Sequence, residues 1–310
     1  MEATLDVEAA RGPTGRTARH SILVTGVPRS GTTWLARLLA TAPGTALAGR
    51  EPMNPRGNQY ALAHTLDGWA RLDHPTPRQA RALRRSYTGL NPLVYSRYGR
   101  RQWAAPLPWT RLIMKDPFAM LSLPAVARTT GTTPVLLYRH PGAVLASYRR
   151  MGWEPDLEEL QPVVRAYRAR ATRSSDALGD LPRVGEASPA VAMGRFWGAL
   201  YAIALGEAQN VPGLVIVSHE EVAQGGVRAA RCLLDALGLS WSDETAVELA
   251  KETGGSGSTT GNELHNFDRP PAEVATAWRG KLEPGDLDEI EAATSEIRTR
   301  LEAARLPLLG

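Results

Sequence analysis

The chain has 310 residues, of which 43% are hydrophobic and 22% are charged, as is typical of globular proteins. The net charge of +4 suits an anionic small ligand, and the absence of basic runs interleaved with aromatics argues against nucleic-acid binding. The single cysteine, the six scattered histidines and the lack of an apolar stretch near the roughly 20 residues of a membrane span predict a cytoplasmic protein without disulfide, metal or membrane insertion.

Four short apolar runs have the length and composition of buried parallel strands, each followed by a turn and a helix-like segment. This alternation predicts an α/β fold, a P-loop-like three-layer domain over 20–310 with a central, mainly parallel sheet between helices. Residues 1–19 are polar and read as a flexible arm. The predicted strands are 21–27, 111–116, 134–139 and 213–218.

Other segments surround these strands. The Pro-, Arg- and aromatic-rich range 52–110 predicts a substrate-side insertion of short helices and loops, and 151–190 is similarly polar and broken by prolines. Apolar 191–208 predicts a buried helix, 254–261 (GGSGSTTG) a flexible linker or lid, and 287–306 an amphipathic closing helix. Pro141 is placed at a first helical position, whereas Pro124 is expected to break the helix after the second strand.

The first strand leads into GVPRSGTTW, residues 26–34, which nearly matches the phosphate-binding spacing GxxxxGK[ST]. A glycine loop before a helix offers backbone N–H groups to an anion. However, Thr32 stands where the lysine that reaches the outer phosphates belongs, and Arg29 supplies a cation three positions earlier. The loop therefore favours a ligand with a 5′-phosphate group and no triphosphate tail.

PRSGTTW resembles the 5′-phosphosulfate loop of sulfotransferases that use 3′-phosphoadenosine 5′-phosphosulfate (PAPS). Two further segments match in order, and a fourth matches weakly. IMKDPFA (113–119) is similar to a segment of tyrosylprotein sulfotransferases and their bacterial relatives, and LLYRHPGAVLASYRR (136–150) is similar to the family's 3′-phosphate segment. The weaker match is AWRGKLEPGDLDEI (277–290). The resemblance implies PAPS as co-substrate, without a metal.

The resemblance also implies ligand contacts. Arg29 would stabilise the charge that develops on the 5′-phosphate side of the breaking bond. Arg139 and Ser147 would hold the 3′-phosphate, and the loop residues would contact the 5′-phosphate: Ser30, Gly31, Thr32 and Thr33. Trp34 and Trp197 have two open interpretations each, adenine contact or hydrophobic core.

Glu51 is the candidate general base, because tyrosylprotein and carbohydrate sulfotransferases carry a Glu after the first helix. Its alternative is a loop glutamate paired with Arg50 or Arg56. Asp116 is the reserve base, although an Asp before Pro more often caps a turn. Lys115 would add charge on the sulfuryl oxygens. Arg269 and Arg279 are candidates to close over the 3′-phosphate as basic C-terminal residues do in relatives, but GGSGSTTG occurs in place of the family's R-K-G motif, and this departure leaves the lid unassigned.

Three functional hypotheses remain from the sequence. The first is a PAPS-dependent sulfotransferase acting on a hydroxyl group of a small molecule or glycoconjugate. The second is a P-loop small-molecule kinase, which must explain the missing lysine and the missing magnesium carboxylate. The third is an inactive nucleotide-binding module, which the presence of Arg29, Glu51 and Lys115 disfavours. The oligomeric state is not predicted.

Overall fold

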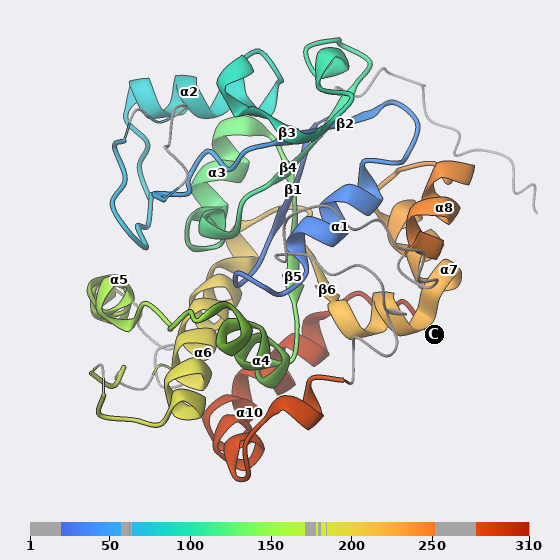
Figure 1. Cartoon of the computed structure of the whole chain (residues 1–310). Helices are drawn as coiled ribbons and strands as arrows, with labels where there is room; N and C mark the ends of the chain where they lie inside the picture. The colour runs from blue at the N-terminus through green and yellow to red at the C-terminus, as the bar shows by residue number, and fades with distance from the viewer. Residues whose placement is uncertain are drawn as a thin grey trace, which may run out of the picture.

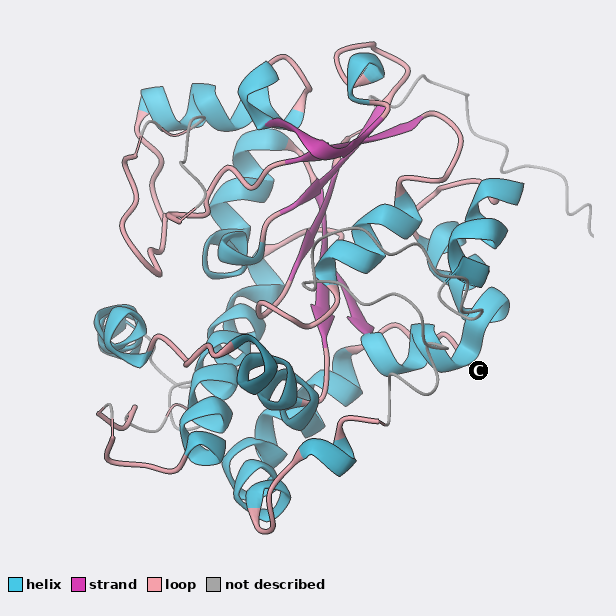
Figure 2. Cartoon of the chain, in the orientation of Figure 1, coloured by secondary structure: helices cyan, strands magenta, loops and turns pink. Residues whose placement is uncertain are grey.

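The computed structural model describes residues 20–56, 62, 64–170, 178, 181–183, 185–251 and 277–309. Their centre is a six-stranded sheet in the order β3-β2-β4-β1-β5-β6, with helices on both faces (Figures 1 and 2). The predicted α/β class with a central, mainly parallel sheet is therefore confirmed. The strands are β1 (Ile22–Thr25), β2 (Thr45–Gly49), β3 (Tyr95–Arg100), β4 (Arg111–Lys115), β5 (Thr133–Tyr138) and β6 (Val215–Ser218).

Four of these strands lie where the apolar runs predicted them, and two were not predicted. β2 pairs parallel with β4, and β3 pairs antiparallel with β2 at the edge of the sheet. β3 falls inside the range 52–110, so this range is not made of helices and loops alone. β1 lies between β4 and β5, so the strands that follow it in the chain lie on both sides of it in the sheet. α/β proteins bind ligands at the carboxyl ends of strands where the strand order reverses in this way.

Alternate residues of each strand face two separate cores. Ile22 and Val24 belong to the core beneath α1 (Thr32–Leu39), α7 (His219–Ala236) and α8 (Asp243–Lys251). Leu23 belongs to the other core, beneath α6 (Pro189–Glu207) and α10 (Asp286–Ala304). Figure 1 shows these two helical layers on opposite sides of the sheet. Because successive side chains of a strand point to opposite faces of the sheet, the same strands contribute to both cores.

The remaining helices also refine the sequence prediction. α4 (Pro141–Met151) begins with Pro141 as predicted. Pro124 is the second residue of α3 (Leu123–Thr130). In this first turn its missing N–H costs nothing, so Pro124 does not break the helix. A 3-10 helix, η3 (Pro117–Ser122), precedes α3. α5 (Leu157–Arg170) was not predicted, since Pro162 lies inside it.

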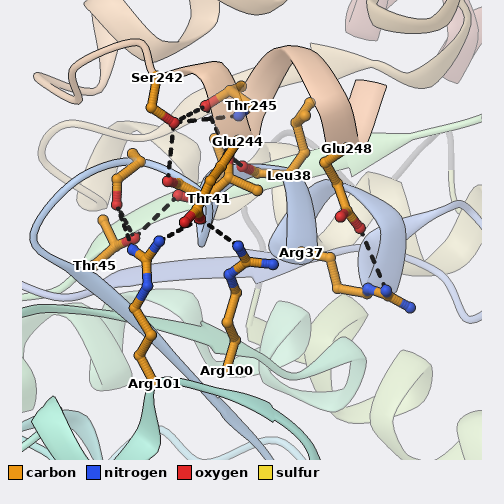
Figure 3. Close-up of polar contacts among 12 residues, drawn as sticks. Arg37, Leu38, Thr41, Thr45, Arg100, Arg101, Ser242, Glu244, Thr245 and Glu248 are labelled. Atoms are coloured by element: carbon orange, nitrogen blue, oxygen red, sulfur yellow. Dashed lines mark hydrogen bonds and ion pairs between the residues drawn. The ribbon is translucent and has the colours of Figure 1, made fainter. Parts of the chain in front are cut away.

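Residues 77–104 form a helix, the edge strand β3 and the short helices that flank this strand. α2 (Pro77–Tyr87) begins with a reciprocal capping box between Thr76 and Gln79. Two short 3-10 helices, η1 (Pro92–Val94) and η2 (Gln102–Ala104), flank β3. Figure 3 shows Arg100 and Arg101 reaching Glu244 of α8, which joins the end of this segment to the far helical layer. The predicted linker 254–261, Arg269 and the arm 1–19 lie outside the described residues.

Candidate active site

The loop after β1 ends in a glycine at a position that is strained for other residues. Gly31 has a φ of 92°, and a Cβ built there would lie 2.4 Å from Cδ2 of the buried His219. Gly31 is also the N-cap of α1, and no side chain caps this helix. The first N–H groups of α1, beginning at Thr32, are therefore directed at the space in front of the loop, as in anion-binding helix termini.

Three side chains from separate elements meet at this loop. Arg29 donates its Nε–H to Ser147 Oγ of α4 at 3.0 Å, and Arg139, which follows β5, donates to the carbonyl oxygen of Arg29 at 3.5 Å. Burial lowers the pKa of both guanidinium groups, and the nearby charge of Arg150 lowers both further, whereas the charge of Glu220 opposes this shift in the pKa of Arg139. Because these cations lie together in a poorly solvated place, a bound anion would stabilise them.

A pocket of about 620 Å³ opens beside the loop. Glu51 lies in it, with Lys115 Nζ in contact with its Oε1 and Asn54 Nδ2 in contact with its Oε2. Arg56, one of the two partners considered for Glu51, instead contacts Asp156 at 2.9 Å. The lining residues are Pro28, Arg29, Thr32, Thr33, Glu51, Asn54, Arg56, Lys115, Pro117, Phe118, Tyr148, Trp153, Glu154 and Asp156. The pocket thus gathers the three residues predicted to be catalytic: Arg29, Glu51 and Lys115.

Asp116, the reserve base, is completely buried behind this pocket. Its Oδ2 accepts the Met53 N–H at 2.6 Å, and its Oδ1 accepts the Phe118 N–H at 3.1 Å. Burial, together with the charge of Glu51, raises the pKa of Asp116 to about 8. Asp116 therefore caps η3 and holds the loop that carries Glu51, which is the alternative role considered from the sequence.

Comparison with protein-family models gives one decisive match. Residues 21–243 match the model described as "Sulfotransferase family". The chain belongs to the sulfotransferase family. The match includes every residue that lines the pocket, from Pro28 to Asp156.

A solved structure shows the same fold at low sequence identity. The sulfotransferase domain from the curacin biosynthetic pathway is 17% identical, with a TM-score of 0.50, over 93% of this chain and 99% of that one. The sulfotransferase domain of the Synechococcus PCC 7002 olefin synthase is 17% identical, with a TM-score of 0.47, over 97% and 100%. The comparison with curated proteins gives no significant match.

Sequence reasoning did not single out His219, which packs against Gly31 in this sulfotransferase. It follows β6 directly at the carboxyl edge of the sheet, as Arg139 follows β5, and α/β proteins bind ligands at this edge. The His219 and Trp34 rings meet edge to face at 5.2 Å, and both are buried. Their Nδ1 and Nε1 atoms lack hydrogen-bond partners among the described residues. Burial lowers the pKa of His219 well below its usual value, so its ring is neutral.

Trp197 supports the site from behind. Its side chain has no exposed surface, and its Nε1–H donates to the carbonyl oxygen of Arg139 at 3.1 Å. The indole also packs against Tyr201, whose hydroxyl donates to the Leu137 carbonyl oxygen at 2.7 Å. Of the two interpretations considered for Trp197, the structure supports the core, where it fixes the backbone of Arg139; a direct adenine contact does not fit its complete burial.

The C-terminal segment returns to the start of α4. Trp278 stacks on His140 with 4.4 Å between ring centroids, and packs with Ala143 and Ala146. Arg279 lies over the Trp278 ring and is exposed, so the structure places it beside α4, and a contact with the 3′-phosphate stays a prediction. Among the described residues, no group of metal-ligand side chains and no helix suited to crossing a bilayer is found.

Proposed function

We propose that this protein transfers the sulfuryl group of PAPS to a hydroxyl group of a small molecule or glycoconjugate. The observation that carries the proposal is the meeting of Arg29, Glu51 and Lys115 in one pocket, although they come from three separate segments of the chain. Sulfuryl transfer from one oxygen atom to another requires a positioned base that accepts the proton and cations that stabilise the developing negative charge.

The site fits an adenine nucleotide with phosphates at two positions. The uncapped N-terminus of α1 offers N–H groups for the 5′-phosphate, and Arg139 with Ser147 offers a guanidinium and a hydroxyl for the 3′-phosphate. Trp34 and His219 are buried beside the loop that precedes α1, with the His219 ring packed on Gly31. Their Nε1 and Nδ1 atoms have no hydrogen-bond partner among the described residues, and a purine would reach them only if the two rings became accessible.

Glu51, Arg29 and Lys115 would each have a role in the reaction. Glu51 takes the proton of the acceptor hydroxyl as its oxygen bonds to sulfur, and the bond between sulfur and the 5′-phosphate oxygen breaks. Arg29 stabilises the charge that this oxygen gains. Lys115 stabilises the sulfuryl oxygens, and for this it must leave Glu51, which frees a carboxylate oxygen for the acceptor.

The aromatic lining of the pocket indicates the kind of acceptor. Phe118, Tyr148 and Trp153 line the pocket, and of these only Trp153 is exposed, at 45%. An exposed aromatic face suits a phenolic ring or the apolar face of a sugar. A carboxylate, Glu154, also lines the pocket.

The kinase alternative is less compatible with the same residues. Thr32 occupies the position of the P-loop lysine, Glu51 is engaged by Lys115, and Asp116 is buried with a raised pKa. A direct test compares the thermal stabilisation given by adenosine 3′,5′-bisphosphate with that given by ATP and magnesium. Sulfotransferase function requires the bisphosphate to stabilise the protein more strongly, and the opposite order favours the kinase.

A further inference from the structure

A basic and apolar surface lies along the β3 edge of the sheet, separate from the pocket lining. No aspartate or glutamate occurs in residues 74–115, whereas Lys115 and eight arginines do. The arginines are Arg78, Arg81, Arg84, Arg85, Arg97, Arg100, Arg101 and Arg111. All the formal charges in this stretch are positive, in a chain whose net charge is only +4. The stretch is therefore suited to binding an anionic partner.

Four of the arginines share one face of α2. At 100° per residue, positions 78, 81, 84 and 85 fall within about 120° of each other, and all four side chains are exposed. Leu83 and Tyr87, on the opposite face, are buried. α2 contains no acidic residue, and none of its arginines forms an ion pair with another described residue. Like charges three and four residues apart repel each other, so α2 bears a cost that a bound anionic surface would remove.

The cations that follow α2 are engaged within the protein. Arg100 and Arg101 both contact Glu244, as Figure 3 shows, and Arg111 donates to backbone carbonyl oxygens of His20 and Leu237. Arg100, Arg101 and Arg111 therefore form contacts within the protein, unlike the arginines of α2. The four arginines of α2 are left for an external partner.

Exposed apolar side chains extend from the turns next to α2. Leu90 is 55% exposed, Leu93 51%, Trp103 78% and Trp109 62%. The Leu90 N–H donates to the Arg85 carbonyl oxygen at 2.9 Å, and the Gly89 backbone packs so closely on Ala105 that a Cβ would lie 2.5 Å away. These contacts join the end of α2 to the loop before β4, and Figure 1 shows both along one border of the molecule.

We propose that the α2 surface, defined as Arg78, Arg81, Arg84, Arg85, Leu90, Leu93, Trp103 and Trp109, attaches the protein peripherally to an anionic lipid bilayer. Arginines beside an anionic leaflet and tryptophans at its headgroup level are the features of interfacial binding. The apolar side chains project from three separate turns. A deformable headgroup layer accommodates such separate projections, whereas a protein partner must match them with a complementary surface. This attachment goes beyond sulfuryl transfer and does not depend on it.

Cosedimentation with phosphatidylcholine vesicles, with and without phosphatidylglycerol, tests the proposal. The full chain should bind the anionic vesicles preferentially, and raised salt should weaken binding. Arg81→Gln/Arg84→Gln/Arg85→Gln should weaken it about fivefold per arginine, the equivalent of ~1 kcal/mol per cation. The matched control, Arg165→Gln/Arg183→Gln/Arg228→Gln, removes three exposed arginines elsewhere and should bind as the wild type does.

Insertion is measured separately by tryptophan fluorescence. Brominated lipids should quench emission, and Trp103→Ser/Trp109→Ser should abolish most of this quenching, while an unchanged circular-dichroism spectrum and urea-unfolding midpoint report an intact fold. Equal binding to neutral and anionic vesicles, equal losses in the two arginine triples, or absence of quenching would overturn the proposal. Retention of an acidic protein or a nucleic acid by the α2 surface, without vesicle binding, would reassign it to that partner.

Discussion

Lys115 and Glu51 contact each other inside the pocket, while Asn54 contacts the second oxygen of the same carboxylate. Each oxygen of the proposed base therefore has a partner within the protein. We propose that the sulfuryl oxygens of the bound donor attract Lys115, which leaves the Glu51 carboxylate to accept the proton of the acceptor hydroxyl. The two residues are adjacent in space because β4 ends at Lys115 and the loop after β2 carries Glu51 along the same edge of the sheet.

We predict that Glu51→Gln lowers turnover by roughly 10²–10⁴, the usual contribution of a positioned base. The amide keeps the size of the side chain and a hydrogen-bonding oxygen for Lys115, so the affinity for adenosine 3′,5′-bisphosphate should stay near that of the wild type. Single-turnover sulfate transfer and calorimetric binding measure the two quantities. Turnover within a few-fold of wild type would show that another group takes the proton.

Arg139→Ala should weaken binding of adenosine 3′,5′-bisphosphate by about 1.5–3 kcal/mol, the range for hydrogen bonds to charged groups. Adenosine 5′-phosphosulfate lacks the 3′-phosphate, and its binding should hardly change. Trp197→Phe serves as a control, because it removes the Nε1–H that fixes the Arg139 backbone and keeps the guanidinium. Equal losses for both ligands would assign Arg139 a structural role.

Asp116→Asn should destabilise the fold by about 1–3 kcal/mol, because an amide has one acceptor oxygen for the two backbone N–H groups of Met53 and Phe118. The folded pKa of Asp116, about 8, lies above its ordinary value of 3.8. The native state therefore binds more protons between these values, and this carboxyl's contribution to stability falls as the pH rises from about 4 to about 8.

The asparagine variant lacks that titration. Urea unfolding should show the largest difference between wild type and variant near the acidic end of this range, and a smaller one near its upper end. A difference that grows as the pH rises would contradict the raised pKa of Asp116.

His140 links α4 to the C-terminal segment in a pH-dependent way. Burial, with the charge of Arg298, lowers its pKa from 6.5 to about 4, although Glu291 opposes this shift. Because the unfolded chain binds the proton more readily, stability should fall as the pH drops from about 6.5 to about 4. His140→Gln should reduce this slope. Urea unfolding at several pH values measures it, and an unchanged slope would show that other groups cause the acid loss.

The sequence predicted the buried parallel part of the sheet well, because short uninterrupted apolar runs such as 134–139 are typical of strands buried on both faces. It missed β2, whose residues TALAG combine small side chains with weak strand preference, and β3, an exposed edge strand containing three arginine or serine positions. α5 was missed because Pro162 reads as a helix breaker, although it lies only one turn and a half from the helix start.

Within the site, local motifs located Arg29, Glu51 and Lys115, yet the sequence could not show that Lys115 rests on Glu51. That contact joins residues 64 positions apart through strand pairing. The burial of Trp197 and the packing of His219 on Gly31 are likewise tertiary facts. Residue type and spacing indicated which groups the site contains, and only the fold established which of them touch.

The central claim is tested most directly by sulfate transfer from labelled PAPS, measured in parallel with phosphate release from ATP and magnesium, for wild type, Arg29→Ala and Arg29→Lys. We predict sulfate transfer by the wild type, a loss of roughly 10²–10³ in Arg29→Ala for the missing charge stabiliser, and a smaller loss in Arg29→Lys, which keeps the charge without the planar fork. Magnesium-dependent ATP hydrolysis by the wild type without any sulfate transfer would contradict the account.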